Sequence, residues 1–222
     1  MMQQTRWQIL QILKRSGGNT VEELCHALDL APMTVRQHLA ILERDGHVVS
    51  GGDRRGHGRP SHVYTLSAAA DDLFPKSYDK LVLRLLQEVA RLQPEDLAER
   101  SSEQKVSLLL DRMAEGQAEA LAKQLSGISL DERGAELAAL LSHREGTLST
   151  WAADGDGAYV MDDHNCPFRA VVEAQPELCQ WHAHLLRTVL DADVTEERCI
   201  AAGANCCRHR IVPHGEPAPH AH

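Results

Sequence analysis

The chain has 222 residues, of which 43% are hydrophobic and only 4% aromatic, and its formal net charge is −9. This length suits one large domain or two small ones, and the scarcity of aromatic residues favours helices over a purely β fold. The sequence contains no run of about 18 uncharged apolar residues and no basic-then-apolar leader. We therefore expect a cytoplasmic protein that does not enter a membrane.

The charges are unevenly distributed along the chain. Residues 1–66 contain eight Lys and Arg and six Asp and Glu, whereas the remainder contains 15 and 26. Only the surface that touches nucleic acid needs a positive potential, so an acidic total does not exclude DNA binding. The distribution favours a DNA-binding head on an acidic body.

The first 45 residues have the pattern of three short helices. Apolar residues at helical spacing mark the first helix over 5–15, which ends at a Ser-Gly-Gly-Asn sequence. Thr20 begins the second helix, with Glu23 three residues later as the partner of a capping box. After a turn containing Pro32, the third helix covers about 33–45.

Two short strands follow, Val48-Val49 and residues 62–66, around a loop rich in Gly and Arg. Helix, helix, turn, helix and wing is the order of a winged helix-turn-helix, for which we expect bounds of 1–67. The start of the third helix would reach base edges, and an extended wing arginine would enter the minor groove. For any single arginine, an ordinary solvated surface charge is the alternative. The candidate DNA-contacting residues are Met33, Thr34, Arg36, Gln37, Arg54, Arg55 and Arg59.

The segments PMTVRQHLAILERDGHV and RRGHGRPSHVYTLS together resemble the bacterial winged-helix repressors. The resemblance implies the fold of this segment and a double-stranded DNA operator as its partner. It does not identify the operator sequence.

A heptad-like apolar stripe runs from Tyr78 to Leu92. Pairing with a second copy of the chain would bury it, as would packing on the C-terminal part of the same chain. Two-fold operators favour dimers, so we expect residues 68–100 to form a dimerisation helix and a linker. Residues 103–126 and 130–145 each have the pattern of an amphipathic helix.

The C-terminal part, which we expect over 101–213, mixes helix and strand. The pattern predicts a strand over 158–161, a helix over 168–190 that is interrupted near Pro176, and an antiparallel hairpin around Gly203. The Pro- and His-rich residues 214–222 have the composition of a disordered tail. The whole chain is thus expected to be an α+β protein that is mainly helical.

Five of the six cysteines lie in the last quarter of the chain. Their spacings differ from the CxxC of a zinc ribbon, so ligands would have to converge from a loop, a helix and a strand. Thiolates select iron–sulfur clusters, zinc or Cu(I). The candidate metal ligands are Cys166, Cys179, Cys207 and, less directly, Cys199.

Strand alternation ranks the remaining thiols. Cys207 would share the inward face with His209, whereas Cys206 would share the outward face with arginines and be a spare, exposed thiol. Cys199 would lie on a strand face with Thr195 and Glu197, which is more polar than the face of Cys207. The isolated Cys25 has the position of a small buried hydrophobe in the helix-turn-helix core.

Three histidines accompany the thiols in sequence. His182 and His184 follow the second of the clustered cysteines as an HxH pair, which can bind zinc, and His164 precedes Cys166 by two residues. Singly, each of these histidines more commonly lies on a surface or a helix face.

The sequence HNCPF at 164–168, Cys179 and AAGANCCRHRI at 201–211 resemble the iron–sulfur-sensing winged-helix repressors of the Suf assembly operon. The resemblance extends over most of the chain. It implies a homodimeric repressor with a [4Fe–4S] cluster in each subunit, held by Cys166, Cys179 and Cys207.

The chain departs from this family at one point. Some members have a further cysteine near the position of Ala192 or Asp193, and this chain has none there. Cys199, Asp193, a nearby histidine or an external ligand could occupy the fourth position. A regulator that uses zinc or a bare thiol redox switch remains the alternative to a cluster.

Motifs of catalysis are missing from the sequence. It contains no glycine-rich phosphate loop, no nucleophile elbow and no motif that couples a cysteine to a catalytic base. We therefore expect a regulator rather than an enzyme, with operator DNA and a second copy of itself as partners and no small-molecule substrate.

Overall fold

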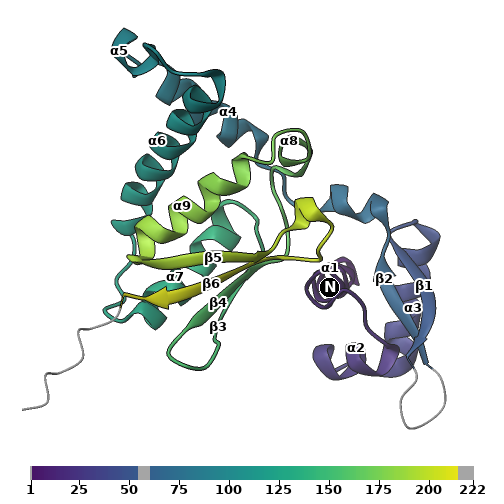
Figure 1. Cartoon of the computed structure of the whole chain (residues 1–222). Coiled ribbons are helices and arrows are strands. Elements are labelled where there is room, and N and C mark those ends of the chain that lie inside the picture. The colour runs from purple at the N-terminus through teal and green to yellow at the C-terminus, as the bar shows by residue number, and fades with distance from the viewer. Residues whose placement is uncertain (1, 55–60, 215–222) are drawn as a thin grey trace, which may run out of the picture. The chain divides into compact units, whose positions relative to one another are not determined.

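The computed structural model describes residues 2–54 and 61–214, and it divides the chain into two compact units, Met1–Pro75 and Lys76–His222 (Figure 1). We expected the DNA-binding domain to end at residue 67, but the 3₁₀ helix η1 (Ala68–Leu73) also belongs to the first unit. Phe74 is buried there and its ring lies 5.3 Å from that of Trp7. The expected tail, from residue 215 onward, lies outside the described residues.

The N-terminal unit is a winged helix-turn-helix, as predicted. Its elements are α1 (Met2–Ser16), α2 (Val21–Leu28), α3 (Pro32–Arg44), β1 (Val48–Arg54) and β2 (Ser61–Leu66), the two strands being antiparallel. The predicted capping box is present: Thr20 Oγ1 accepts a hydrogen bond from the Glu23 amide, and the Glu23 carboxylate accepts one from the Thr20 amide. This pair satisfies two otherwise unpaired amides and fixes where α2 begins.

The C-terminal unit begins with seven helices and strands. These are α4 (Tyr78–Val89), α5 (Pro94–Leu97), α6 (Ser102–Ala122), α7 (Leu130–Arg144), β3 (Ser149–Ala153), β4 (Tyr159–Asp163) and α8 (Arg169–Ala174). The remaining elements are α9 (Leu178–Leu190), β5 (Ala192–Arg198), the 3₁₀ helix η2 (Ile200–Ala202) and β6 (Cys207–Pro213). The helix predicted over 168–190 is interrupted between α8 and α9 at the position of Pro176. The α+β fold class is confirmed.

Four antiparallel strands form one sheet in the order β3-β4-β6-β5. The β5–β6 hairpin was predicted, whereas β3 was not. Trp151, Met161, His209 and Glu196 are directly paired across the four strands, so their side chains point to the same face. This row defines the inner face of the sheet.

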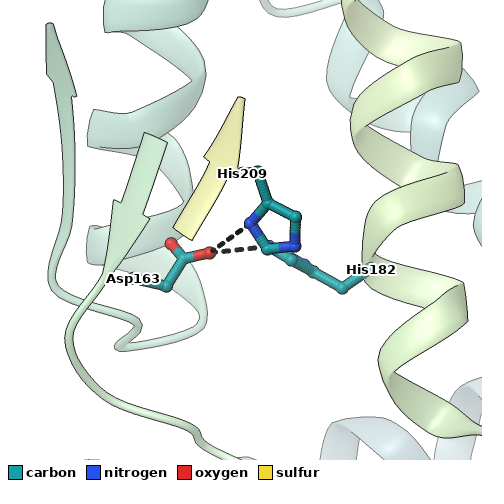
Figure 2. Close-up of side chains that lie close together, drawn as sticks. All are labelled: Asp163, His182 and His209. Atoms are coloured by element: carbon teal, nitrogen blue, oxygen red, sulfur yellow. Dashed lines mark hydrogen bonds and ion pairs between the residues drawn. The ribbon is translucent and has the colours of Figure 1, made fainter. Parts of the chain in front are cut away.

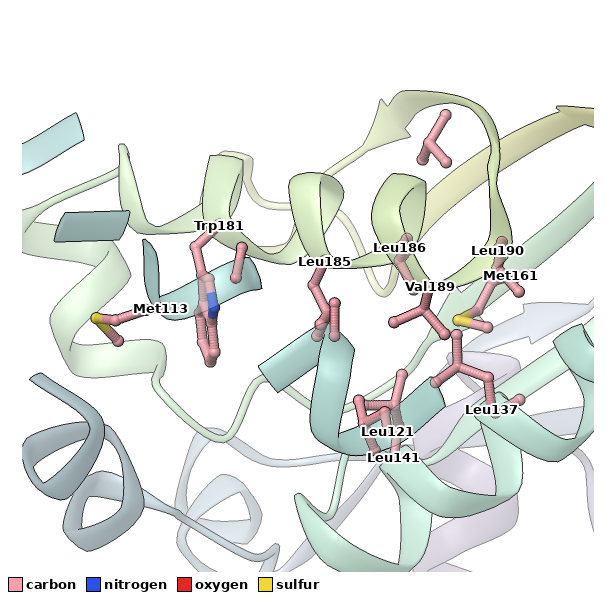
Figure 3. Packing of buried hydrophobic residues seen from close by; sticks show 14 of the residues in the cluster. Met113, Leu121, Leu137, Leu141, Met161, Trp181, Leu185, Leu186, Val189 and Leu190 are labelled. Carbon is pink, nitrogen blue, oxygen red and sulfur yellow. The ribbon is translucent and has the colours of Figure 1, made fainter. Parts of the chain in front are cut away.

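Two helices cover the inner face. α7 approaches so closely at Gly134 that a Cβ atom there would collide with the ring of Trp151. α9 brings Leu185 and Leu186 into the core that Figure 3 shows, where they are fully buried. Side chains from these helices therefore exclude water from the inner face where they pack on it. A polar group buried there costs free energy unless it has a hydrogen-bond or ionic partner.

Among the described residues, no helix is both long and apolar enough to cross a membrane.

Candidate metal centre and DNA-contacting surface

Four cysteines converge at one end of the inner face. Cys166 lies in the loop after β4, Cys179 in the first turn of α9, Cys199 directly after β5, and Cys207 at the start of β6. All four are partly buried and none forms a disulfide. The Sγ atoms of Cys179 and Cys199 are 3.7 Å apart, and Cys207 Sγ accepts a hydrogen bond from the Ile200 amide. The elements expected to converge are therefore adjacent in space.

Cys199 joins the group because β5 contains a bulge. The pairing shifts between Glu196 and Arg198, which face His209 and Arg208 respectively. One extra residue on β5 reverses the alternation, so a residue after the bulge changes faces. Regular alternation had placed Cys199 on a polar face. The bulge explains why its thiol instead lies beside that of Cys179.

Asp193, another candidate for the fourth ligand, is at the far end of the hairpin. It pairs with Val212, whereas Cys207 is at the opposite end of β6. Its side chain is exposed, and a carboxylate oxygen lies 3.7 Å from a ring nitrogen of His214. The structure does not bring Asp193 to the thiols.

Burial and the neighbouring thiols raise the pKa values of Cys166, Cys179 and Cys207. Burial, with the neighbouring Cys199, raises the pKa of Cys179 to about 12. Burial also raises the pKa values of Cys166 and Cys207, the latter despite its amide hydrogen bond. Thiolates this crowded require a compensating cation, so a bound metal would replace their protons.

A second cluster of polar side chains, which we call the Asp–His–His group, consists of Asp163, His182 and His209 (Figure 2). Asp163 and His209 lie at inward positions of β4 and β6, and His182 reaches them from α9. His182 Nε2 is 2.8 Å from Asp163 Oδ2, and His209 Nδ1 is 3.8 Å from the same oxygen. This group and Cys166, Cys179 and Cys207 line one cavity.

The three groups perturb one another's ionisation. Burial alone would raise the pKa of Asp163, but the charge and hydrogen bond of His182 hold it below its usual value. The same pairing raises the pKa of His182 against the effect of burial. Burial, reinforced by the charge of His182, lowers the pKa of His209 to about 4. His209 is therefore a neutral imidazole near pH 7.

Asp163 and His209 were not among the candidate ligands expected from the sequence. The available signal was alternation, because both are polar residues at positions whose neighbours on the same face are Met161 and Ile211. His182 and His184 had been considered as an HxH pair. On a helix, residues two apart point to different sides, and His184 instead pairs with Asp111 at 2.9 Å.

Other expectations about single residues need correction. Cys206 is buried, not exposed, and its Sγ lies 3.9 Å from an Asp162 carboxylate oxygen. It precedes β6, which begins at residue 207, so strand alternation does not govern it. Burial, and then the Asp162 charge, raise its pKa. Cys25 is only partly buried in α2, and His164 is buried, with Nε2 3.4 Å from the Thr150 hydroxyl.

The candidate DNA-contacting surface is the exposed side of α3. Arg36 and Gln37 are exposed, Met33 is 65% exposed and Thr34 is partly buried, while Val35 faces the core. This places one positive and one amide side chain on the surface that a recognition helix presents to a groove. Arg55 and Arg59 lie outside the described residues, as does the side chain of Arg54.

Comparison with known proteins supports the assignment of this domain. Residues 3–49 match the family model described as bacterial regulatory protein, arsR family. The match covers α1 to α3 and the start of β1, which is a minor part of the chain. No curated protein matches the chain.

Two solved structures are similar at low identity. A trafficking protein particle complex subunit 3 from Naegleria fowleri, covalently bound to palmitic acid, is 12% identical over 61% of this chain and 97% of that one, with a TM-score of 0.41. Bacillus subtilis PadR in complex with operator DNA is 13% identical over 82% and 94%, with a TM-score of 0.28. At such low scores, neither structure bears on what this chain does. The N-terminal unit is a DNA-binding helix-turn-helix domain of a transcriptional regulator, similar over residues 3–49 to the arsR family of bacterial regulatory proteins.

Proposed function

We propose that the chain is a metal-sensing transcriptional regulator in which the four converging thiols hold a [4Fe–4S] cluster. The observation that carries this proposal is that four cysteines from four different elements are neighbours: Cys179 Sγ lies 3.7 Å from Cys199 Sγ, and Cys166 and Cys207 line the same cavity as Cys179. Four thiols at one partly buried site fit the Cys₄ donor set of such clusters. Bound there, the cluster would supply sensitivity to oxidant and to iron supply.

Zinc is the second candidate, and one distance favours it. Two thiolates on one tetrahedral zinc ion lie about 3.8 Å apart, given bonds of about 2.3 Å. The Sγ atoms of Cys179 and Cys199 are separated by 3.7 Å. Cysteines that bind different irons of a cluster stand further apart, so cluster binding requires these two thiols to separate.

A hydrogen-bonded path leads from the thiols to the start of α4. The carbonyl of Pro167, next to Cys166, accepts a hydrogen bond from the Ser77 amide at 3.2 Å. The Tyr78 hydroxyl accepts one from the Ala170 amide. Since Ser77 directly precedes α4, rearrangement of the Cys166 loop would disturb the beginning of that helix.

α4 is also the element by which we expect two copies to pair. It has an exposed apolar side formed by Val82, Leu83, Leu85, Leu86 and Val89. A second copy would bury this side and place two DNA-binding domains on a two-fold operator. Metal occupancy, acting on the start of α4, would then alter the affinity for DNA. Repression of iron–sulfur assembly genes is the expected output and rests on the resemblance to the Suf regulators.

Anaerobic purification with analysis of iron, acid-labile sulfide and zinc tests the proposal. The wild-type protein should contain four irons and four sulfides per chain, as a [4Fe–4S] cluster requires. The iron and sulfide content per chain should fall in each of four variants: Cys166→Ser, Cys179→Ser, Cys199→Ser and Cys207→Ser. Cys25→Ser is the control. Zinc without sulfide, reduced in the four cysteine variants, would support the second candidate, and absence of both zinc and sulfide from the folded protein would reject both.

A further inference from the structure

The Asp–His–His group has a feature that an ordinary buried ion pair does not explain. His209 is 1% exposed, and within the described residues neither of its ring nitrogens has a hydrogen-bond partner. An unsatisfied buried imidazole costs free energy unless something absent from the protein chain pairs with it. The Asp163 carboxylate lies beside the ring, with Oδ2 3.8 Å from Nδ1, so a cation bound by both side chains would supply a partner for that nitrogen.

We propose that Asp163, His182 and His209 form a mononuclear binding site for a divalent transition-metal ion, Zn²⁺ or Fe²⁺, separate from the thiol site. Two imidazoles and one carboxylate are the donor set these ions take when a further position stays open. The group lines the same cavity as the cysteines, so an additional ligand could reach that position.

The distances suit such an ion. Ligand atoms around a tetrahedral ion with bonds of about 2.0–2.1 Å lie about 3.4 Å apart. From Asp163 Oδ2, the distance to His182 Nε2 is 2.8 Å and that to His209 Nδ1 is 3.8 Å, one shorter and one longer than this value. The ring centroids of the two histidines are 5.2 Å apart and the ring planes are inclined at 60°, as those of two imidazoles directed at one point can be. Small side-chain rotations would therefore complete the site.

Groups behind the ligands are placed as they are in known metal sites. Ser149 donates its hydroxyl hydrogen to Asp163 Oδ1, which fixes the carboxylate while leaving Oδ2 directed at the histidines. Glu196 Oε2 lies 3.9 Å from His209 Nε2, which is beyond hydrogen-bond distance, and an approach of about 1 Å would let it accept that N–H when Nδ1 binds metal. Carboxylates that orient a histidine ligand in this way strengthen metal affinity.

The site makes a prediction that does not depend on what the thiols hold. Replacing all four cysteines of the thiol site by serine leaves the Asp–His–His group intact. The metal-free variant should bind one Co²⁺, and the absorption should lack the intense sulfur-to-cobalt charge-transfer bands. Adding Asp163→Asn or His182→Gln should weaken Co²⁺ binding at least about tenfold, whereas His184→Gln on the same helix should not.

Two results would overturn the proposal: no Co²⁺ bound by the folded four-serine variant, or equal affinity after Asp163→Asn. If circular dichroism shows that the four-serine variant does not fold, X-ray absorption spectroscopy on the zinc-loaded wild-type protein takes the place of the Co²⁺ measurement. The nitrogen and oxygen ligands of the bound zinc should then be lost in Asp163→Asn and kept in His184→Gln. If these ligands persist in both variants, the proposed site is rejected. Acid-labile sulfide comes only from a cluster at the thiols, whereas Co²⁺ binding by the four-serine variant reports only on the Asp–His–His group, so failure of either hypothesis is recognised separately.

Discussion

Cys179 and Cys199 lie with their Sγ atoms 3.7 Å apart, although one begins a helix and the other follows a strand twenty residues later. A disulfide requires these atoms to approach to about 2.05 Å, a small movement for two partly buried side chains. In the metal-free protein, mild oxidation should therefore join these two residues before any other pair. Peptide mapping under non-reducing conditions measures the linkage.

The rate of this oxidation should rise with pH. Because the pKa of Cys179 is raised to about 12, its thiolate is scarce at pH 7 and increases as the pH rises. Cys199→Ser should abolish the linkage, and bound metal should protect against it. A dominant disulfide from Cys166 to Cys179 would contradict the geometry described here.

Two helical glycines should respond in opposite directions to alanine. Gly134→Ala places a methyl group against the Trp151 ring and should destabilise the protein by about 1–3 kcal/mol. At Gly116, in α6, the nearest atom to a new Cβ is Glu88 Oε1 at 3.7 Å, an ordinary contact. Gly116→Ala should stabilise by up to about 1 kcal/mol through helix propensity. Urea unfolding of the two variants measures both changes, and equal signs would contradict the packing.

Acid should destabilise the metal-free protein through His209. In the unfolded chain a histidine takes up its proton near pH 6.5, whereas the folded protein holds the pKa of His209 at about 4. Between these values the unfolded state binds more protons, so stability falls as the pH falls from about 6.5 to 4. The loss is on the order of 3 kcal/mol for a shift of this size.

Urea midpoints of wild type and His209→Gln across this pH range provide the measurement. The variant should lose less stability on acidification than the wild type, and His184→Gln should behave as the wild type does. Parallel curves for wild type and His209→Gln would show that this ring does not control the acid response.

The α3 surface gives a prediction for DNA binding. Arg36→Ala and Gln37→Ala should each weaken binding to the preferred duplex by about 1–3 kcal/mol, because this is the binding free energy that a specific contact with a base contributes. Arg44 lies at the other end of α3, is exposed and pairs with Asp45, so Arg44→Ala is the matched control. Fluorescence anisotropy on duplexes selected by the wild-type protein measures the affinities. Wild-type affinity in both Arg36→Ala and Gln37→Ala would exclude this surface from sequence recognition.

The apolar side of α4 should control association. Leu86→Glu adds a charge where 58% of the leucine is exposed, so the monomer should still fold while pairing is lost. Light scattering after gel filtration should give twice the chain mass for the wild type and the chain mass for the variant. Ile128→Glu, at a 96% exposed loop position, is the control. A wild-type monomer at micromolar concentration would refute the proposed dimer.

The local sequence determines much of the fold. Thr20 and Glu23 form a capping box because their spacing matches the first turn of a helix, and alternation correctly placed His209 beside Ile211 on the inner face. These features depend on neighbours a few residues away. The winged domain and the β5–β6 hairpin could be predicted for this reason.

Features that depend on distant residues were missed. The bulge before Arg198, which turns Cys199 toward Cys179, leaves no mark in the alternation pattern. β3 was overlooked because it becomes a strand by pairing with β4, and its Trp151 is accommodated only by Gly134 on α7. The Asp–His–His group likewise combines residues from three elements, so no sequence spacing reveals it.

The connection between the two units is very short. Phe74 is buried in the N-terminal unit and Ser77 is buried in the C-terminal unit, with only Pro75 and Lys76 between them. Three residue steps span at most about 10–11 Å, and proline further restricts the first of them. Such a tether has little slack to absorb a displacement of Ser77. A movement of Ser77, if rearrangement of the Cys166 loop produces one, would therefore arise only three residues from the last buried side chain of the DNA-binding domain.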